Sequence, residues 1–246
     1  MSHRIDALVV VVPAHDEEEL LSSCLASLEI ATLAARGVVE RIEVVVVLDA
    51  CTDGSGEIAR AAGMRVVETD ARSVGVARAA GVAAGLEELI DVDHRHIWTA
   101  HTDADSTVPP HWLTHQLALA HRGAHAVVGT VRPDFDDLSP EQTEAWWATH
   151  TPGTANGHVH GANLGLRADV LLRAGGFPGI PAHEDVRLMD RVRSAGAHVV
   201  ASDAAWVRTS GRAQGRAPEG YARYLREDLT AAVAAEAQLP REISLL

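Results

Sequence analysis

Apolar positions in the first half of the chain fall into short continuous runs separated by longer stretches of helical periodicity. The runs predict strands at Ala7–Val12, Ile42–Leu48, Met64–Glu68, Ile97–Ala100 and Ala126–Thr130. The stretches between them predict helices at Glu17–Ala35, Asp53–Ala62, Ser73–Ile90 and Pro110–Arg122. Strands that are apolar along their length and alternate with helices indicate a parallel sheet covered on both faces. In such sheets, ligands bind beyond the carboxyl ends of the strands.

The second half of the chain is less regular. Prolines and glycines interrupt Arg132–Val159, which we expect to be mostly loop around a short helix near Glu141–Ala148. Beyond it, the pattern predicts strands at His160–Arg167 and His198–Ser202 and helices at Ala168–Ala174 and Glu184–Ala195. A glycine follows each of these helices, which is a common stop signal. No repeat or linker divides the chain, so we expect a single α/β domain over residues 1–246.

Composition narrows the class of protein. Of the 246 residues, 47% are apolar and 22% are charged, which is typical of a globular domain. The net charge of −13 argues against a nucleic-acid partner, because phosphate backbones are bound by basic surfaces. A metal ion or local arginines can still hold an anionic ligand. The chain contains no lysine, which excludes Schiff-base lysines and the lysine of a Walker phosphate loop.

The cysteines and the apolar runs bear on location. Cys24 and Cys51 form no disulfide framework or CxxC pair, which favours a reducing cytoplasm. The longest apolar runs, near Ala7–Val12 and Val44–Leu48, are too short to cross a bilayer. We therefore expect a cytoplasmic protein without a transmembrane segment, and peripheral membrane association stays open.

An Asp-x-Asp (DXD) motif, Asp103 and Asp105, directly follows a predicted strand. Two carboxylates placed in this way can converge on one hard cation together with the diphosphate of a nucleotide. The alternative is a turn that caps the helix starting at Pro109-Pro110. Zinc is a second alternative, suggested by His94, His96 and His101, but a His-x-His pair with a distant third ligand is unspecific and a solvated loop is favoured.

Five segments in order resemble glycosyltransferase family 2 over roughly residues 6–200. They are the strand, proline and acidic helix start of Val10–Glu19, the sequence VVVVLDACTDGS at Val44–Ser55, the helix Gly75–Gly81 with Arg78, the DXD segment Ile97–Leu113, and Gly161–Arg167 continuing through Gly175–Pro178 to His183–Asp185. Some positions depart from the family pattern. Leu48 stands where an acid is frequent, and His15 and Cys51 also differ. The departures weaken any inference about the base of the donor.

The resemblance implies a GT-A fold, a Rossmann-like, mostly parallel sheet flanked by helices in one domain. It implies a nucleotide-binding half at about residues 1–130 and an acceptor-side half at about 131–246. The implied activity is that of a hexosyltransferase-like enzyme. It would transfer a sugar from a UDP- or GDP-sugar to an unknown hydroxyl acceptor and depend on Mn²⁺ or Mg²⁺. Inversion with a carboxylate base is favoured, and retention stays open because GT-A folds host both. A homodimer is left open.

The resemblance also assigns roles to residues. The metal would be held by Asp105 and Asp103, and the acceptor deprotonated by Asp185 with help from Glu184. The nucleotide sugar would contact Pro13, Ala14, His15, Glu17, Asp49, Arg78, Asp103 and Ala104. The acceptor or donor-sugar side would include Gly161, Ala162 and Asn163. Apart from the resemblance, Arg208, Arg212 and Arg216 recur at every fourth position, and Gly211 and Gly215 favour a loop over a helix there. Such a loop could close on a diphosphate or on an anionic acceptor, or it could be a solvated surface.

Plainer explanations exist for several of these residues. Glu17 suits the first turn of a helix, and Glu184 and Asp185 suit helix capping. Arg78 lies in a helix of small residues, where a buried guanidinium needs an acidic or phosphate partner, unless it reaches the surface. The segment His158–Asn163 could serve strand packing. The pair Trp146-Trp147 could form a platform for a sugar or lipid acceptor, or pack into a core.

Two other functions share parts of this pattern. A metal-dependent phosphohydrolase or nucleotidylyltransferase also uses paired aspartates, but a nucleotidylyltransferase usually carries a glycine-rich loop and a lysine that this chain lacks. A non-catalytic nucleotide-sugar-binding module is the third hypothesis. The joint presence of Asp103, Asp105, Glu184 and Asp185 argues against it.

Overall fold

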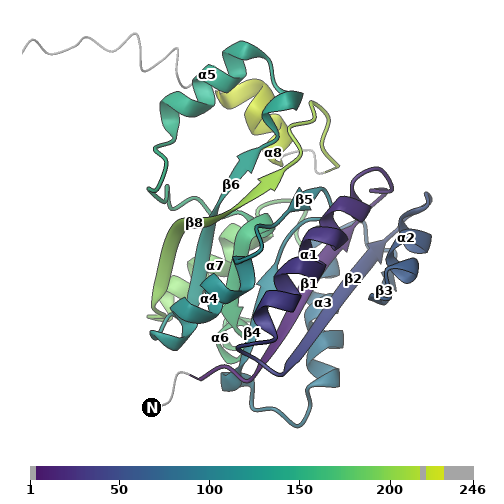
Figure 1. The fold of residues 1–246 in the computed structure, drawn as a ribbon, viewed down its shortest axis with the longest axis vertical. Coiled ribbons are helices and arrows are strands. Elements are labelled where there is room, and N and C mark those ends of the chain that lie inside the picture. The colour runs from purple at the N-terminus through teal and green to yellow at the C-terminus, as the bar shows by residue number, and fades with distance from the viewer. Residues whose placement is uncertain (1–3, 217–219, 230–246) are drawn as a thin grey trace, which may run out of the picture.

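The computed structural model describes residues 4–216 and 220–229 of the chain. The ends of the expected 1–246 domain therefore lie outside the described residues. Within them, one eight-stranded sheet has the order β3-β2-β1-β4-β7-β6-β8-β5 (Figure 1). No helix among the described residues is long and apolar enough to cross a bilayer.

Helices and strands alternate along the chain largely as predicted. The strands are β1 (Ala7–Ala14), β2 (Arg41–Asp49), β3 (Arg65–Thr69), β4 (Ile97–His101), β5 (Ser106–Thr107), β6 (Ala126–Pro133), β7 (Leu164–Arg167) and β8 (Val199–Thr209). The α-helices are α1 (Leu21–Ala35), α2 (Ser55–Ala61), α3 (Val74–Glu88), α4 (Trp112–His121), α5 (Pro140–Thr149), α6 (Ala168–Arg173), α7 (Glu184–Ser194) and α8 (Tyr221–Arg223). Single turns of 3₁₀-helix occur at His94–His96, Phe135–Asp137 and Gly161–Asn163, and a π-helical turn, Tyr224–Asp228, follows α8.

The sheet is covered on both faces because its central strand is apolar on both sides. Every residue of β1 is buried, and it pairs in parallel with β2 and β4. Alternate residues point to opposite faces. Leu8, Val10 and Val12 belong to a core that includes α1 and α4. Val9 and Val11 belong to a second core that includes α3, α6 and α7.

Helix α3 approaches the sheet closely through two glycines. A Cβ atom added to Gly81 would lie 2.4 Å from Cγ1 of Val11, and one added to Gly85 would lie 2.3 Å from Cγ1 of Val9. Only glycine lets the helix backbone reach this depth. The close approach also sets the position of Arg78, one turn before Gly81 on the same helix.

The second half of the sheet is mixed and longer than predicted. β7 runs antiparallel to both β4 and β6, whereas β6 and β8 are parallel to each other. The expected strands at residues 126–130 and 198–202 continue to Pro133 and Thr209. The end of β8 alternates buried and exposed residues, so a search for continuous apolar runs misses it. The strand expected at His160–Arg167 begins only at Leu164, because Gly161–Asn163 form a 3₁₀ turn.

The extensions of β6 and β8 lead from the sheet to α5 and α8 (Figure 1). Together with the π-helical turn and Leu229 after it, these helices form a separate small core around Trp146, Leu225 and Leu229. The molecule therefore has a large two-faced sheet core and a small helical cluster beside it.

Candidate functional site

A cavity of about 790 Å³ lies at the carboxyl ends of β1, β2 and β4. It collects most of the predicted site from distant parts of the chain. The predicted residues that line it are Pro13, Ala14, His15, Glu17, Asp49, Arg78, Asp103, Ala104, Asp105, Gly161, Ala162, Glu184, Asp185 and Arg212. Asn163 and Arg208 do not line it.

Asp103 and Asp105 follow β4 where that strand leaves the sheet. Oδ1 of Asp105 accepts hydrogen bonds from the hydroxyls of Ser106 and Thr209, each at 3.2 Å, so β5 and β8 hold it in place. Burial, together with the charges of Asp103 and Glu17, raises the pKa of Asp105 to about 6. Burial also raises the pKa of Asp103. Ionisation of both carboxylates is thus less favourable than it would be in water.

Arg78 is buried at the centre of the site, with 2% of its surface exposed. Its guanidinium forms ion pairs with both Asp103 and Glu184. Burial disfavours the charged guanidinium, but these carboxylates outweigh it and raise the pKa of Arg78. The expectation of an acidic partner is confirmed, and the surface alternative is wrong. Gly161 is required beside it, because a Cβ there would lie 2.3 Å from Nη2 of Arg78.

Glu184 and Asp185 are the first two residues of α7, but their side chains make different contacts. Glu184 is 4% exposed and is held by Arg78; burial raises its pKa. Oδ2 of Asp185 accepts a hydrogen bond from the backbone N–H of Gly161 at 2.7 Å, and Oδ1 accepts one from Val186 N–H at 2.7 Å. The N-cap position of α7 is His183, and its side chain makes no capping bond. Asp185 therefore faces the cavity and is oriented by a segment 24 residues away.

Asp49 shapes the loop between β3 and α3. Its Oδ1 accepts hydrogen bonds from Thr69 Oγ1 and from the N–H groups of Ala71 and Arg72, and its Oδ2 accepts one from Ser73 N–H. Burial opposes ionisation, but these donors lower the pKa of Asp49. His15 lies against the same turn, with Nδ1 2.6 Å from the carbonyl oxygen of Asp49. Asp49 thus lines the cavity while both of its oxygens organise this loop.

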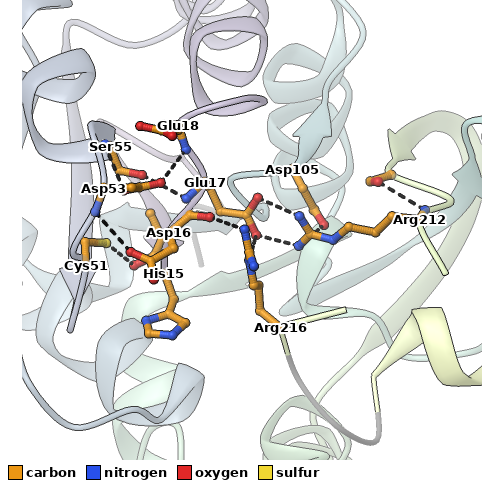
Figure 2. A network of polar contacts seen from close by, with 12 residues as sticks. His15, Asp16, Glu17, Glu18, Cys51, Asp53, Ser55, Asp105, Arg212 and Arg216 are labelled. Atoms are coloured by element: carbon orange, nitrogen blue, oxygen red, sulfur yellow. Dashed lines mark hydrogen bonds and ion pairs between the residues drawn. The ribbon is translucent and has the colours of Figure 1, made fainter. Parts of the chain in front are cut away.

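A network around Glu17 joins a segment near the start of the chain to the segment that follows β8 (Figure 2). Glu17 accepts hydrogen bonds from Nη1 and Nη2 of Arg212 at 2.8 and 2.5 Å, and Nη2 of Arg212 lies 3.1 Å from Asp105. Nε of Arg216 lies 3.7 Å from Glu17. The helix-start explanation of Glu17 is wrong, because α1 begins at Leu21 and has no acid in its first turn. The predicted loop around Gly211 and Gly215 is confirmed.

Two residues that were predicted for the site make structural contacts outside the cavity instead. Asn163 is buried below the cavity, where its Oδ1 accepts a hydrogen bond from Trp112 and its Nδ2 donates to the carbonyl oxygens of Thr130 and Ala205. For Asn163 the packing explanation is therefore correct. Arg208 lies 3.4 Å from Asp134 and donates to Thr107, outside the cavity, so the loop reaches the site through Arg212.

Sequence reasoning missed a group of rings on the cavity wall, namely His150, His158, His160, Tyr221 and Tyr224. The His-x-His spacing at 158–160 and the Tyr pair three residues apart were the available signals. The two neighbouring tryptophans differ in burial: Trp146 is buried in the small core, whereas Trp147 is 42% exposed. Of the described residues, Asp16, Cys51 and Asp53 come within metal-binding reach of one another, and that group includes none of the histidines considered for zinc.

The sequence matches the family model described as glycosyl transferase family 2 over residues 9–168. It is also 33% identical over 169 residues to a dolichyl-phosphate hexose transferase of Haloferax volcanii, which covers 68% of this chain and 67% of that protein.

Solved structures of glycosyltransferases share the fold. A mannosyltransferase from Pyrobaculum calidifontis, in complex with GDP-Man and Mn²⁺, has a TM-score of 0.64 at 22% identity, covering 95% of this chain and 65% of that one. TarS of S. aureus, residues 1–349 with UDP-GlcNAc, has a TM-score of 0.63 at 16% identity, covering 88% and 62%. This chain thus spans less than two thirds of these two proteins.

A glucosyl-3-phosphoglycerate synthase from M. tuberculosis, with Mn²⁺ and UDP, has a TM-score of 0.54 at 17% identity and covers 97% of this chain and 82% of that one. These likenesses confirm the expected GT-A fold. Because the family model and the relative from Haloferax volcanii each match more than half of its length, this chain belongs to glycosyltransferase family 2.

Proposed function

We propose that this chain transfers a sugar from a UDP- or GDP-sugar to a hydroxyl acceptor, with inversion at the anomeric carbon. The observation that carries the proposal is that Asp103, Asp105 and Asp185 face one cavity at the carboxyl edge of the sheet. Transfer by a single displacement needs one set of groups for the leaving diphosphate and a separate carboxylate for the acceptor. Family membership supports the same reaction class.

Asp105, with Asp103, would hold a Mn²⁺ or Mg²⁺ ion. Both aspartates are oxygen ligands of the type these ions prefer. Burial and the neighbouring carboxylates raise the pKa of Asp105, so a cation beside it would favour its ionised form. When bound, the metal ion would stabilise the charge that develops on the leaving diphosphate.

Asp185 would accept the proton of the acceptor hydroxyl. The N–H of Gly161 orients its Oδ2, and Arg78 holds Glu184 beside it. The residues Pro13, Ala14, His15, Glu17, Asp49 and Ala104 would surround the nucleotide, because they line the cavity at the ends of β1, β2 and β4. Arg212 would turn from Glu17 and Asp105 to the diphosphate once the metal is present.

Thermal shift with a panel of UDP-glucose, UDP-N-acetylglucosamine and GDP-mannose tests the donor half of the proposal. A donor present at about 100 times its Kd stabilises the protein by about 2.7 kcal/mol. We expect one donor to do so in Mn²⁺ and to lose the effect in EDTA. Asp105→Asn should lose the metal-dependent shift, and the surface variant Asp91→Asn should keep it. Equal donor affinity with and without chelator would overturn the metal assignment.

Analysis of the products separates transfer from the other reactions of paired aspartates. A transferase releases the nucleoside diphosphate and leaves the sugar on the acceptor. A phosphohydrolase would release a phosphate or sugar phosphate, and a nucleotidylyltransferase would make or consume pyrophosphate. Donor binding without turnover on any acceptor would identify a binding module.

A further inference from the structure

One wall of the cavity is made of flat rings. His158 and His160 lie with ring centroids 6.2 Å apart, His160 and Tyr221 5.6 Å apart, and Tyr221 and Tyr224 5.7 Å apart. All four rings, with His150, line the cavity. Aromatic faces with a few polar atoms are a common lining for uncharged ligands.

The small helical core holds this ring wall in place. Nε1 of Trp146 donates a hydrogen bond to the Tyr221 hydroxyl at 3.0 Å. The imidazole of His150 stacks on Trp146, with centroids 3.7 Å apart and an interplanar angle of 7°. The wall also adjoins the proposed base, since His160 precedes Gly161, whose N–H binds Asp185. A molecule against the rings would therefore lie next to Asp185.

Two imidazoles of the ring wall have lowered pKa values. Burial lowers the pKa of His160 to about 4, in spite of the opposing charge of Asp185. Burial also lowers the pKa of His150. Both imidazoles are therefore uncharged, and Asp185 contributes a negative charge beside them.

Three of the four arginines of the described chain that line the cavity pair with carboxylates. Arg78 pairs with Asp103 and Glu184, and Arg212 and Arg216 gather at Glu17. Arg72 lies on the loop that Asp49 organises, at the nucleotide end.

The arginine on strand β6 also has an acidic partner. Val131 lines the cavity, whereas the next residue, Arg132, lies 2.9 Å from Asp203 and 4.5 Å from the ring centre of Trp206. Arg132 does not line the cavity, and its guanidinium is paired with Asp203. A phosphate bound at the ring wall would face Asp185 and the donor diphosphate with no arginine of residues 4–216 and 220–229 paired to it, which is unfavourable.

We propose that the ring wall binds an uncharged carbohydrate whose hydroxyl is presented to Asp185, and that it does not bind a phosphorylated acceptor. The inference rests on the proposed function and names its acceptor class. The acceptor oxygen forms a bond to the anomeric carbon of the donor, its proton passes to Asp185, and the bond from that carbon to the diphosphate breaks with its electron pair leaving on the nucleoside diphosphate. Two similar proteins carry a phosphorylated compound in their names, dolichyl phosphate and 3-phosphoglycerate. We expect this chain to use an acceptor without a phosphate group, in contrast to the compounds in those two names.

The test compares neutral and phosphorylated acceptors on the protein loaded with Mn²⁺ and the donor that the thermal-shift panel selects. The neutral probes are methyl α-glucoside, methyl α-mannoside and farnesol. Their charged counterparts are glucose 6-phosphate, mannose 6-phosphate and farnesyl phosphate. Transfer and saturable binding, measured by product analysis and saturation-transfer NMR, should occur with a methyl glycoside and be lost in Tyr221→Ala. Preference for any phosphorylated probe, equal use of both classes, preference for farnesol, or no saturable binding of either glycoside overturns the inference.

A gain-of-charge variant gives an independent readout. His158 is exposed on the cavity wall, so His158→Arg should add the missing cation and tighten binding of glucose 6-phosphate about tenfold. His94→Arg, exposed and absent from the cavity lining, is the matched control. Unchanged phosphate binding in His158→Arg counts against the charge argument. If no nucleotide sugar binds at the outset, the proposed function fails. If the donor binds and phosphorylated acceptors react, the acceptor inference alone fails.

Discussion

At the scale of single residues, the site depends on buried charges that neutralise one another. Arg78 joins Asp103, from the end of β4, to Glu184, at the start of α7. Coulomb attraction in such a place offsets the cost of desolvation only while all partners are present. Removing one member leaves the others buried and uncompensated, so we expect these residues to be needed for stability, apart from any part in the proposed reaction.

Arg78→Ala should therefore destabilise the protein by about 3–5 kcal/mol. The loss leaves Glu184 buried without its cation. Urea denaturation measures the change, and Arg60→Ala is the control, since Arg60 pairs with Glu68 on the surface and should matter little. Equal stability of Arg78→Ala and wild type would show that Glu184 is not held as described.

Asp185→Asn should lower kcat about 10²–10⁴-fold while donor affinity stays the same. The amide still accepts a hydrogen bond from Gly161 but cannot take a proton from the acceptor. Steady-state kinetics at saturating substrates measures the loss. Asp190→Asn, at an exposed position of the same helix, should behave as wild type. A loss confined to Glu184→Gln would exchange the two roles, and a loss in neither would exclude this base.

Several site residues were predictable because their chemistry is unusual for their place in the chain. Asp103 and Asp105 follow an apolar strand, and Arg78 is a lone charge among small residues. Asn163 was wrongly expected on the acceptor or donor-sugar side, because the pattern does not reveal that Trp112, Thr130 and Ala205 use its amide. Likewise, His150 and Tyr221 meet only through packing on Trp146, which no local pattern encodes.

At the scale of elements, apolar periodicity predicted the strands that are buried on both faces and failed for those that are not. β1 and β4 are buried throughout, so their runs are continuous. β5 has two residues and exists only by pairing with β8, which depends on tertiary contact. The antiparallel placement of β7 also escaped prediction, since the same short apolar strand fits either direction.

Gly85→Ala should destabilise the protein by about 1–3 kcal/mol, although alanine favours helices. The added methyl group would collide with Val9 in the central strand. Thermal or urea unfolding measures the change. Ala83→Gly, at an exposed position of the same helix, isolates the propensity effect and should cost about 1 kcal/mol. A stabilised Gly85→Ala protein would contradict the close packing of α3 on β1.

At the scale of the whole molecule, the site brings together residues that lie far apart in the sequence. Glu17, near the start, is bound by Arg212, 195 positions later (Figure 2). Asp105 lies between them in sequence and joins the same contact. The guanidinium thus pairs with Asp105, a carboxylate that the proposed metal ion would also need, so arginine and metal compete for it.

Arg212→Gln should tighten binding of Mn²⁺ in the absence of nucleotide by about tenfold, because the competing positive charge is removed. Isothermal titration calorimetry of the metal alone measures the effect without any turnover. Arg208→Gln removes an arginine from the same segment but outside the cavity and should leave the affinity unchanged. Weaker or unchanged Mn²⁺ binding in Arg212→Gln would show that the two cations do not compete.

The separate core around Trp146, Leu225 and Leu229 has a consequence for local unfolding. A cluster of a few side chains has a lower opening free energy than the two-faced sheet, so its amide hydrogens should exchange with solvent well before those of β1 and β4. Because the same cluster holds the rings of His150 and Tyr221, each such opening would dismantle one end of the cavity and leave the other intact. The protein would then pass through short-lived states that retain a nucleotide but have no surface for an acceptor.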